Sequence, residues 1–192
     1  NTTQPGDADQ VRNGQNPRPS CQRRSVATPV HALQPTIRPS AAYKRPRYHG
    51  ERQVSSIFTR IINGEIPGRI VWRDMVCVAM VDIRPLNRGH VLVIPIEEVD
   101  RWTDLSADTA SHCMTVARTI GRAQQELFAP LRVGLMIAGF EVPHAHLHVV
   151  PIDSMDHLNF ANADPDPDPN DLDQVAELLR QALRRAGHEA VT

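Results

Sequence analysis

The chain of 192 residues has few aromatic side chains and little net charge. Phe, Trp and Tyr make up 4% of its residues, and 21 Lys and Arg stand against 22 Asp and Glu. Proteins that bind nucleic acid without sequence preference combine basic surfaces with aromatic rings that stack on bases. The composition therefore favours an aliphatic core, and we expect no nucleic acid among the partners.

A long apolar segment is also lacking. A membrane-spanning helix needs about 18 or more consecutive apolar residues, and the sequence contains neither such a run nor a secretory signal core. The three cysteines, Cys21, Cys77 and Cys113, are widely spaced and form no metal-ligand motif. We therefore expect a soluble, cytoplasmic protein with reduced cysteines and no membrane partner.

Residues 1–54 differ from the rest in composition. They carry nine Lys and Arg against three Asp and Glu, whereas residues 55–192 carry twelve against nineteen. They show no sustained apolar periodicity and predict a disordered basic extension, either a solvated tail or an arm for nucleic acid. The first methionine is Met75, so our hypothesis is that translation starts near Val54 and that residues 1–53 are not native.

From residue 55 onward the apolar pattern predicts an α+β domain. Strands are expected over residues 69–73, 75–81, 90–95, 131–138 and 144–151. A short helix follows Ser56, and a long helix capped by Asp104 or Ser106 runs to about residue 128 with Met114 and Ile120 on its buried face. Short connections favour antiparallel pairing, so we expect five antiparallel strands covered by helices.

The segment after the last strand has a composition of its own. Proline alternates with aspartate over residues 164–169, which predicts an extended spacer because proline disrupts both helices and ladders. Asn170 or Asp171 is expected to cap a final helix that ends near Gly187. The predicted organisation is thus an extension (1–54), a main domain (55–163), and a linker with a C-terminal helix (164–192).

Three histidines at alternate positions, His144, His146 and His148, are the strongest indication of function. In a strand, side chains two residues apart share a face, so the three imidazoles would form one row. Burying such a row is costly, which indicates a site rather than a core.

The row has three interpretations. Zinc is one, although three ligands in a line fit tetrahedral coordination poorly. Structural histidines are another, but three in register are unusual. The third, which we favour, is a central nucleophile whose neighbours fix its tautomer and bind oxyanions.

The sequence around the row resembles the histidine-triad (HIT) family. Residues 144–150 fit its His-φ-His-φ-His-φ-φ signature, where φ is apolar. Residues 57–67, 78–85 and 89–95 resemble three further segments of the family in the correct order, so the resemblance covers about residues 55–152. It is greatest to the nucleoside-phosphoramidase branch and its bacterial relatives. The resemblance implies a HIT-like fold with a long helix and a short N-terminal helix on a five-stranded antiparallel sheet, usually in a homodimer whose sheets join.

The resemblance also implies a reaction. His146 would attack the α-phosphorus of a purine nucleoside monophosphate derivative, an AMP or GMP phosphoramidate, anhydride or related conjugate, and water would hydrolyse the nucleotidyl-histidine. His148 would hold the phosphate, His144 would accept the second ring proton of a neighbouring imidazole, and His90 would join this network. No cofactor or metal is implied. The resemblance gives nucleotide-binding roles to a carboxylate for the ribose and to apolar residues for the base: Asp82, Ile57, Phe58, Ile61, Met80 and Ile83.

The sequence departs from the family just before the triad. Phe140 stands where glutamine is usual, Glu141 where a hydroxyl is common, and the Asn-x-Gly loop is missing or shortened. Glu141 is also expected at the nucleotide-binding site, where it would repel phosphate, donate a proton or face water. Ser56 and Thr59 replace the Cys-x-x-Cys of relatives that hold a structural zinc, so we expect none there. The lost donors motivate an alternative function, a nucleotide-binding regulatory module with little catalysis, and a zinc-dependent hydrolase is a third.

Overall fold

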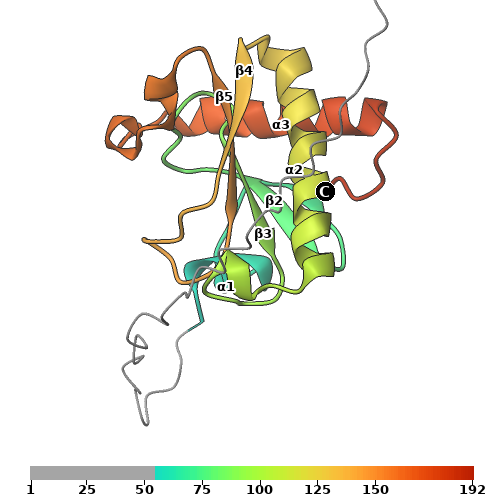
Figure 1. Cartoon of the computed structure of the whole chain (residues 1–192). Coiled ribbons are helices and arrows are strands. Elements are labelled where there is room, and N and C mark those ends of the chain that lie inside the picture. Colours follow the sequence, from blue (N-terminus) through green and yellow to red (C-terminus); the bar gives the residue numbers. More distant parts are fainter. Residues whose placement is uncertain (1–54) are drawn as a thin grey trace, which may run out of the picture. The chain divides into compact units, whose positions relative to one another are not determined.

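Five antiparallel strands form one sheet in the order β1-β2-β3-β5-β4 in the computed structural model, which describes residues 55–192 (Figure 1). The predictions made for residues 1–54 lie outside the described residues. The sheet confirms the predicted fold class and the predicted number of strands. Its strands are β1 (Ile70–Arg73), β2 (Cys77–Val81), β3 (Val91–Pro95), β4 (Arg132–Met136) and β5 (Leu147–Ile152).

Side-chain caps begin each of the three α-helices of the described region. Ser56 caps α1 (Ile57–Ile62) and Ser106 caps α2 (Ala107–Phe128), each accepting a backbone N–H three residues later. The cap of α3 (Pro169–Arg185) is Asp168, so the predicted caps Asn170 and Asp171 were wrong. Proline is well tolerated at the first helical position because its missing N–H has no intrahelical partner there.

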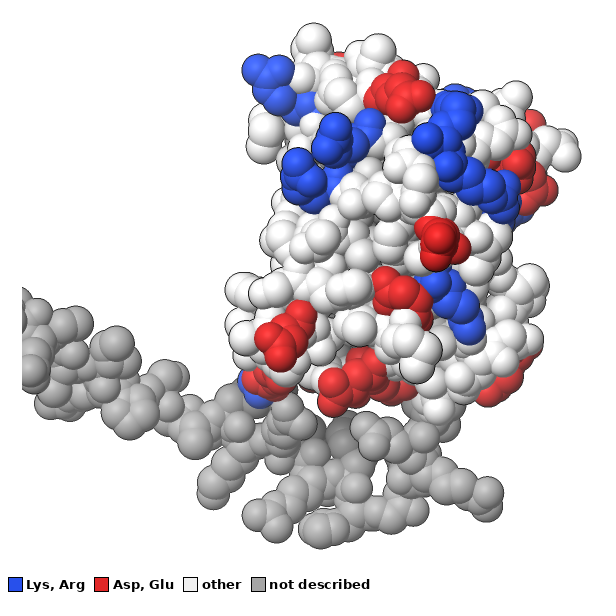
Figure 2. Space-filling view, turned by 90° about the vertical axis from the view of Figure 1, so that its right-hand side faces the viewer, with Lys and Arg blue, Asp and Glu red and all other residues white. Residues whose placement is uncertain are grey.

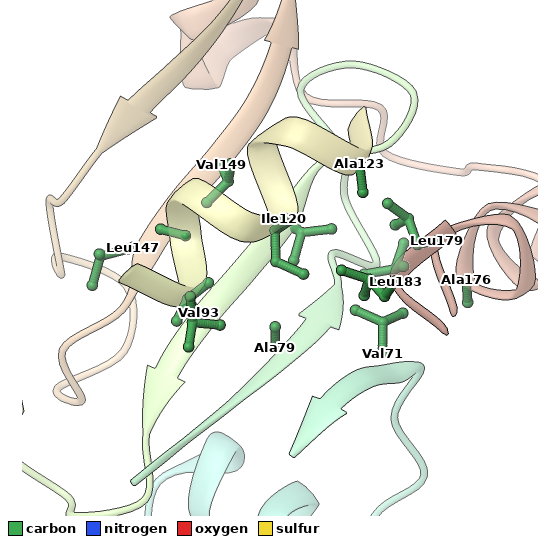
Figure 3. Close-up of a cluster of buried hydrophobic side chains, with 14 of the residues drawn as sticks. Val71, Ala79, Val93, Ile120, Ala123, Leu147, Val149, Ala176, Leu179 and Leu183 are labelled. Atoms are coloured by element: carbon green, nitrogen blue, oxygen red, sulfur yellow. The ribbon is translucent and has the colours of Figure 1, made fainter. Parts of the chain in front are cut away.

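The larger core lies between one face of the sheet and the helices α2 and α3 (Figure 3). On α2 the buried face runs through Cys113, Ile120 and Gln124, whereas Met114, predicted to be buried, is 46% exposed. The helix is therefore rotated from the position that the apolar pattern indicated. The sheet side of this core is made of small and branched side chains: Val71, Cys77, Ala79, Val81, Val91, Val93, Leu147 and Val149.

The opposite face of the sheet carries α1. Phe58 and Ile62 of this helix pack on side chains from β2 and β3, among them Met80 and Leu92. Residues of β5 alternate between the faces: Leu147 and Val149 enter the larger core, so His148 faces the α1 side. His148 therefore lies on the face of the sheet that α1 covers.

The last strand of the structure is shorter than the one predicted over residues 144–151. β5 begins at Leu147, and His144 and His146 precede it. Their segment is held by loop hydrogen bonds, with the His144 N–H donating to Val142 and the Ala145 N–H donating to Val99. The three imidazoles therefore do not form one uniform row on a strand.

The described surface shows charges of both signs. Figure 2 shows the side of the molecule rotated a quarter turn from Figure 1, with basic atoms mainly in its upper half and acidic atoms mainly in its lower half. Among the described helices, none is long and apolar enough to cross a membrane.

Candidate active site

A hollow of about 250 Å³ opens on the α1 face of the sheet. It is bordered by α1, the end of β2, the following loop and two of the three histidines, His146 and His148. Ile57 and Ile83 are exposed at 44% and 62%, so apolar surface reaches the rim. Every residue predicted for nucleotide binding lines this hollow: Ile57, Phe58, Ile61, Met80, Asp82, Ile83 and Glu141.

The tautomer of His146 is fixed by the backbone. Its Nδ1 lies 2.7 Å from the carbonyl oxygen of His144, which can only accept, so Nδ1 carries the proton. In the neutral ring Nε2 then keeps a free lone pair. Burial lowers the pKa of His146, which favours this neutral form. An unprotonated imidazole nitrogen at a pocket is a competent nucleophile.

A second hydrogen-bond chain sets the proton of His148. The Leu86 N–H donates to Nδ1 of His90 at 3.1 Å, so the His90 proton lies on Nε2. That nitrogen is 3.1 Å from Nδ1 of His148 and donates to it. The proton of His148 is therefore on Nε2, as a donor beside His146. Burial, followed by the neighbouring imidazoles, lowers the pKa of His90 to about 3, and burial lowers that of His148 to about 4.

The ring of His144 has hydrogen-bond partners other than those predicted. Its Nε2 donates to the carbonyl oxygen of Pro95 at 2.8 Å, and its Nδ1 accepts from the Ser56 hydroxyl at 2.8 Å. Both ring nitrogens are thus occupied, and the group that accepts the proton of His146 is the backbone carbonyl of His144. The prediction that the His144 ring accepts a proton from a neighbouring imidazole was wrong, because the chain turns at this residue before β5 begins.

Ser56 joins α1 to the histidine segment. Its hydroxyl accepts from the Thr59 N–H while bonding His144, and its own N–H donates to the Glu98 carboxylate at 3.1 Å. The Thr59 hydroxyl also donates to Glu98. Partial burial opposes the effect, yet these hydrogen bonds lower the pKa of Glu98. The hydroxyls at the positions of the family's two cysteines therefore form a hydrogen-bonded cluster, and hydroxyls are not usual zinc ligands.

Gln124 was not identified from the sequence. Its side-chain nitrogen donates to the carbonyl oxygens of Gly89 and Val149, at 2.8 and 2.9 Å. These residues directly adjoin His90 and His148, so one buried amide aligns the two histidine segments. A polar residue on an otherwise apolar helix face was the available signal. Gly89 has a φ of 90°, and a Cβ there would lie 2.5 Å from Phe128, which is why glycine precedes His90.

Asp82 lies at the edge of the hollow. Its Oδ1 accepts the Arg84 N–H at 2.9 Å, and its Oδ2 is 3.4 Å from Nδ1 of His90. Burial, with a smaller effect from Glu141, raises the pKa of this carboxyl group. Nδ1 of His90 has no proton to donate, so Oδ2 of Asp82 lacks a hydrogen-bond donor on that side. Hydroxyl groups of a bound molecule would supply such donors.

A second hollow, of about 220 Å³, meets the first at the histidines. Its other walls are Ala138, Gly139, Phe140, Glu141 and Phe160. The Phe160 ring packs edge-on against His148 with centroids 5.0 Å apart, whereas Phe140 is 97% exposed. Phe160 follows a 3₁₀ turn (Met155–Leu158) that the sequence did not reveal. His146 and His148 therefore lie between two hollows.

The fold and the site together define a class. An α+β domain with five antiparallel strands, whose three histidines lie at the start of one strand beside an apolar hollow, is the arrangement of histidine-triad proteins. The HIT domain family matches residues 63–155. The chain belongs to the HIT family, as its relatives also show.

The relatives and neighbours agree with this assignment. An uncharacterised HIT-like protein of Methanocaldococcus jannaschii is 34% identical over 99 residues, which are 50% of this chain and 77% of that protein. The adenosine 5′-monophosphoramidase hnt1 of Schizosaccharomyces pombe is 30% identical over 51% of this chain and 74% of its own. A zinc-bound histidine triad family protein from Mycobacterium smegmatis superposes with a TM-score of 0.60 and 32% identity, covering 69% of this chain and 96% of that one.

Proposed function

We propose that the protein hydrolyses purine nucleoside monophosphate derivatives through a covalent intermediate on His146. The observation that carries this proposal is the 2.7 Å hydrogen bond from Nδ1 of His146 to the backbone, which leaves Nε2 as a free base beside the hollow. A phosphoramidase among the relatives supports the reaction class.

The nucleotide would bind across the larger hollow. Its base would contact the apolar side chains of α1 and β2, such as Phe58 and Met80, and its ribose hydroxyls would donate to Asp82. The phosphate would then lie at the histidines, where Nε2–H of His148 donates to a non-bridging oxygen. This donor acts on the charge that develops on the phosphoryl oxygens during attack.

The reaction would proceed in two displacements. Nε2 of His146 forms a bond to the α-phosphorus while the bond to the leaving group breaks, and the leaving group takes a proton from solvent. Water then attacks phosphorus and loses a proton to solvent, the P–N bond to His146 breaks, and AMP or GMP is released. The carbonyl oxygen of His144 stabilises the positive charge that the His146 ring carries while it is phosphorylated.

The leaving group would occupy the second hollow. Phe140 and Phe160 offer apolar surface there, and Glu141 places a negative charge at the boundary with the first hollow. An amine leaving group is compatible with this charge, whereas an anionic leaving group is repelled. The chemistry of this hollow therefore favours phosphoramidates over anhydrides.

We also propose that the protein is a homodimer whose sheets join at β4. The edge at β1 is covered, because the Arg73 N–H donates to Ala190 and the Thr192 hydroxyl donates to Ile70. β4 is the other edge of the described sheet, and Leu135 on it is 42% exposed. An uncovered edge favours pairing with another strand. A monomeric mass by light scattering would oppose this proposal.

The test of the function is a pair of histidine substitutions. His146→Asn removes the nucleophile and is expected to lower turnover of an adenosine 5′-phosphoramidate by at least about 1,000-fold with AMP affinity largely retained. His188→Asn is the control, because His188 borders a separate hollow between α2 and α3. Equal turnover by the His146 variant and the parent would refute the proposal. AMP binding by a parent that turns over none of these conjugates would instead favour the regulatory module.

A further inference from the structure

A second group of chemically reactive side chains lies on the other face of the sheet, away from the triad. Asp74 belongs to the turn between β1 and β2, Cys77 begins β2, and His112 belongs to α2. One ligand atom from each of these residues lies within 4.8 Å of the others. Cys77 is part of the core beneath α2, whereas the triad faces α1. None of the three residues has a part in the proposed reaction.

Asp74 is oriented by a complete set of hydrogen bonds. Its Oδ1 accepts the N–H groups of Val76 and Cys77 at 2.8 and 2.9 Å, and its Oδ2 accepts the indole N–H of Trp72 at 2.7 Å. Burial opposes the effect, but these bonds and one from His112 lower the pKa of Asp74 to about 2. The side chain is therefore a carboxylate whose direction is fixed, as metal-ligating carboxylates usually are.

His112 already contacts this carboxylate. Its Nε2 lies 2.7 Å from Oδ2 of Asp74, and its side chain is 38% exposed. The exposure leaves an entry path from solvent to the group. In a tetrahedral zinc site, bonds of about 2.0–2.3 Å place neighbouring ligand atoms about 3.3–3.8 Å apart. Nε2 of His112 and Oδ2 of Asp74 would therefore have to move apart by only about 1 Å or less to make room for an ion in place of the shared proton.

A second thiol lies in the same core. Cys113 follows His112 along α2 and is buried, but it lies outside the group of ligand atoms that are within 4.8 Å of one another. One sulfur atom, one imidazole nitrogen and one carboxylate oxygen are ligands that zinc takes in proteins. A thiol beside a His–Asp pair in contact forms a site that a divalent cation can enter by displacing protons.

We propose that Asp74, Cys77 and His112 form a zinc site that ties the β1–β2 turn to α2. Binding moves the His112 proton from Nε2 to Nδ1 and releases the Cys77 thiol proton to solvent, so that a thiolate, an imidazole and a carboxylate hold the ion. The site joins a turn and a helix through three protein ligands, and a water molecule takes the fourth tetrahedral position. It is independent of the reaction proposed for the triad.

Cobalt(II) is the probe for this site, because its spectrum reports sulfur ligation. Full-length protein with Cys21→Ser is titrated with cobalt(II), so that Cys77 and Cys113 supply the only thiolates. One equivalent is expected to give a sulfur-to-cobalt charge-transfer band with intense tetrahedral d–d bands, and zinc should displace it. Zinc should also raise the unfolding temperature of this protein.

Two substitutions locate the ion. His112→Ala, at a half-buried position on α2, is expected to weaken zinc affinity by more than about 100-fold and to remove the rise in unfolding temperature. Cys77→Ser is expected to remove the charge-transfer band. His148→Ala is the matched control, because His148 belongs to the other group with metal-ligand spacing, Asp82, His90 and His148.

Three results would overturn the proposal. The first is cobalt binding without a charge-transfer band. The second is a zinc-dependent rise in unfolding temperature that persists in His112→Ala and disappears in His148→Ala. The third is a purified protein whose mass is two hydrogens lower and which takes up no cobalt, because Cys77 and Cys113 would then be an oxidised pair.

Discussion

Nε2 of His90 lies 3.1 Å from Nδ1 of His148, and the backbone N–H of Leu86 decides which of the two rings donates. One main-chain proton in a loop therefore sets the tautomer of a histidine at the pocket. This arrangement makes His90 a positioning residue for His148.

His90→Leu is expected to lower kcat/KM by about 10- to 100-fold, because His148 loses the partner that holds its proton on Nε2. His90→Gln should retain more activity, since its amide can accept from Leu86 and donate to His148. The comparison is made on the adenosine phosphoramidate, with kcat and KM determined separately. Equal losses in the two variants would mean that His90 acts only through packing.

Acid should destabilise the fold in a defined pH window. The pKa values of His90 and His148, about 3 and about 4, lie below the ordinary 6.5, so the unfolded chain binds more protons than the folded one between about pH 4 and 6.5. The free energy of unfolding should therefore fall as pH decreases through this window. Asp74, with a pKa of about 2, contributes stability that is lost only below its ordinary value of 3.8.

Urea unfolding at a series of pH values from 7.5 to 4.5 measures this effect. The His90→Gln variant should show a smaller decrease than the parent. A parent protein equally stable at pH 7 and pH 5 would contradict the prediction.

Gln124→Met should destabilise the protein. The substitution keeps the size of the side chain but removes the amide that donates to the buried carbonyls of Gly89 and Val149, and the cost is about 1–3 kcal/mol for each carbonyl left unpaired. Gln125→Met is the matched control, because the neighbouring amide makes one bond, to the Pro130 carbonyl, from an exposed position. Chemical unfolding measures both variants, and similar losses would show that Gln124 has no special role.

Glu141→Gln should change the preference between leaving groups. Removing the negative charge at the boundary of the two hollows is expected to raise kcat/KM for a dinucleoside polyphosphate by about tenfold, with little effect on a phosphoramidate that releases an amine. Glu65→Gln, which alters an exposed carboxylate paired with Arg60, is the control. An unchanged ratio of the two activities would show that Glu141 faces away from the leaving group.

The sequence predicted the sheet and the helices well because their signals are local. Alternating or continuous apolar runs and helix caps are properties of neighbouring residues, and β3 and α1 lie where those signals placed them. The apolar side chains and Asp82 that were predicted at the larger hollow were identified through family resemblance rather than through physical pattern. The start of β5 was missed, because it depends on the bond from Ala145 to the distant Val99.

What the sequence could not provide were contacts between distant segments. The proton of His146 goes to the carbonyl oxygen of His144 and not to its ring, because Ser56 and Pro95 occupy the ring nitrogens. These two residues lie 88 and 49 positions away in the sequence. Gln124 belongs to no motif, and its role depends on the packing of α2 against a loop at Gly89 and against β5 at Val149. Cys77 and Cys113 are 36 positions apart in the chain, so their spacing gave no indication that the core brings them together.

The small size of α1 has a thermodynamic consequence. Six residues are far too few for a helix to persist alone in water, so this wall of the larger hollow depends on its packing against β2 and β3 and on the bonds of its first turn to Glu98 and His144. Amide hydrogens of α1 should consequently exchange with deuterium sooner than those of β3, and a nucleotide resting on Phe58 should slow that exchange.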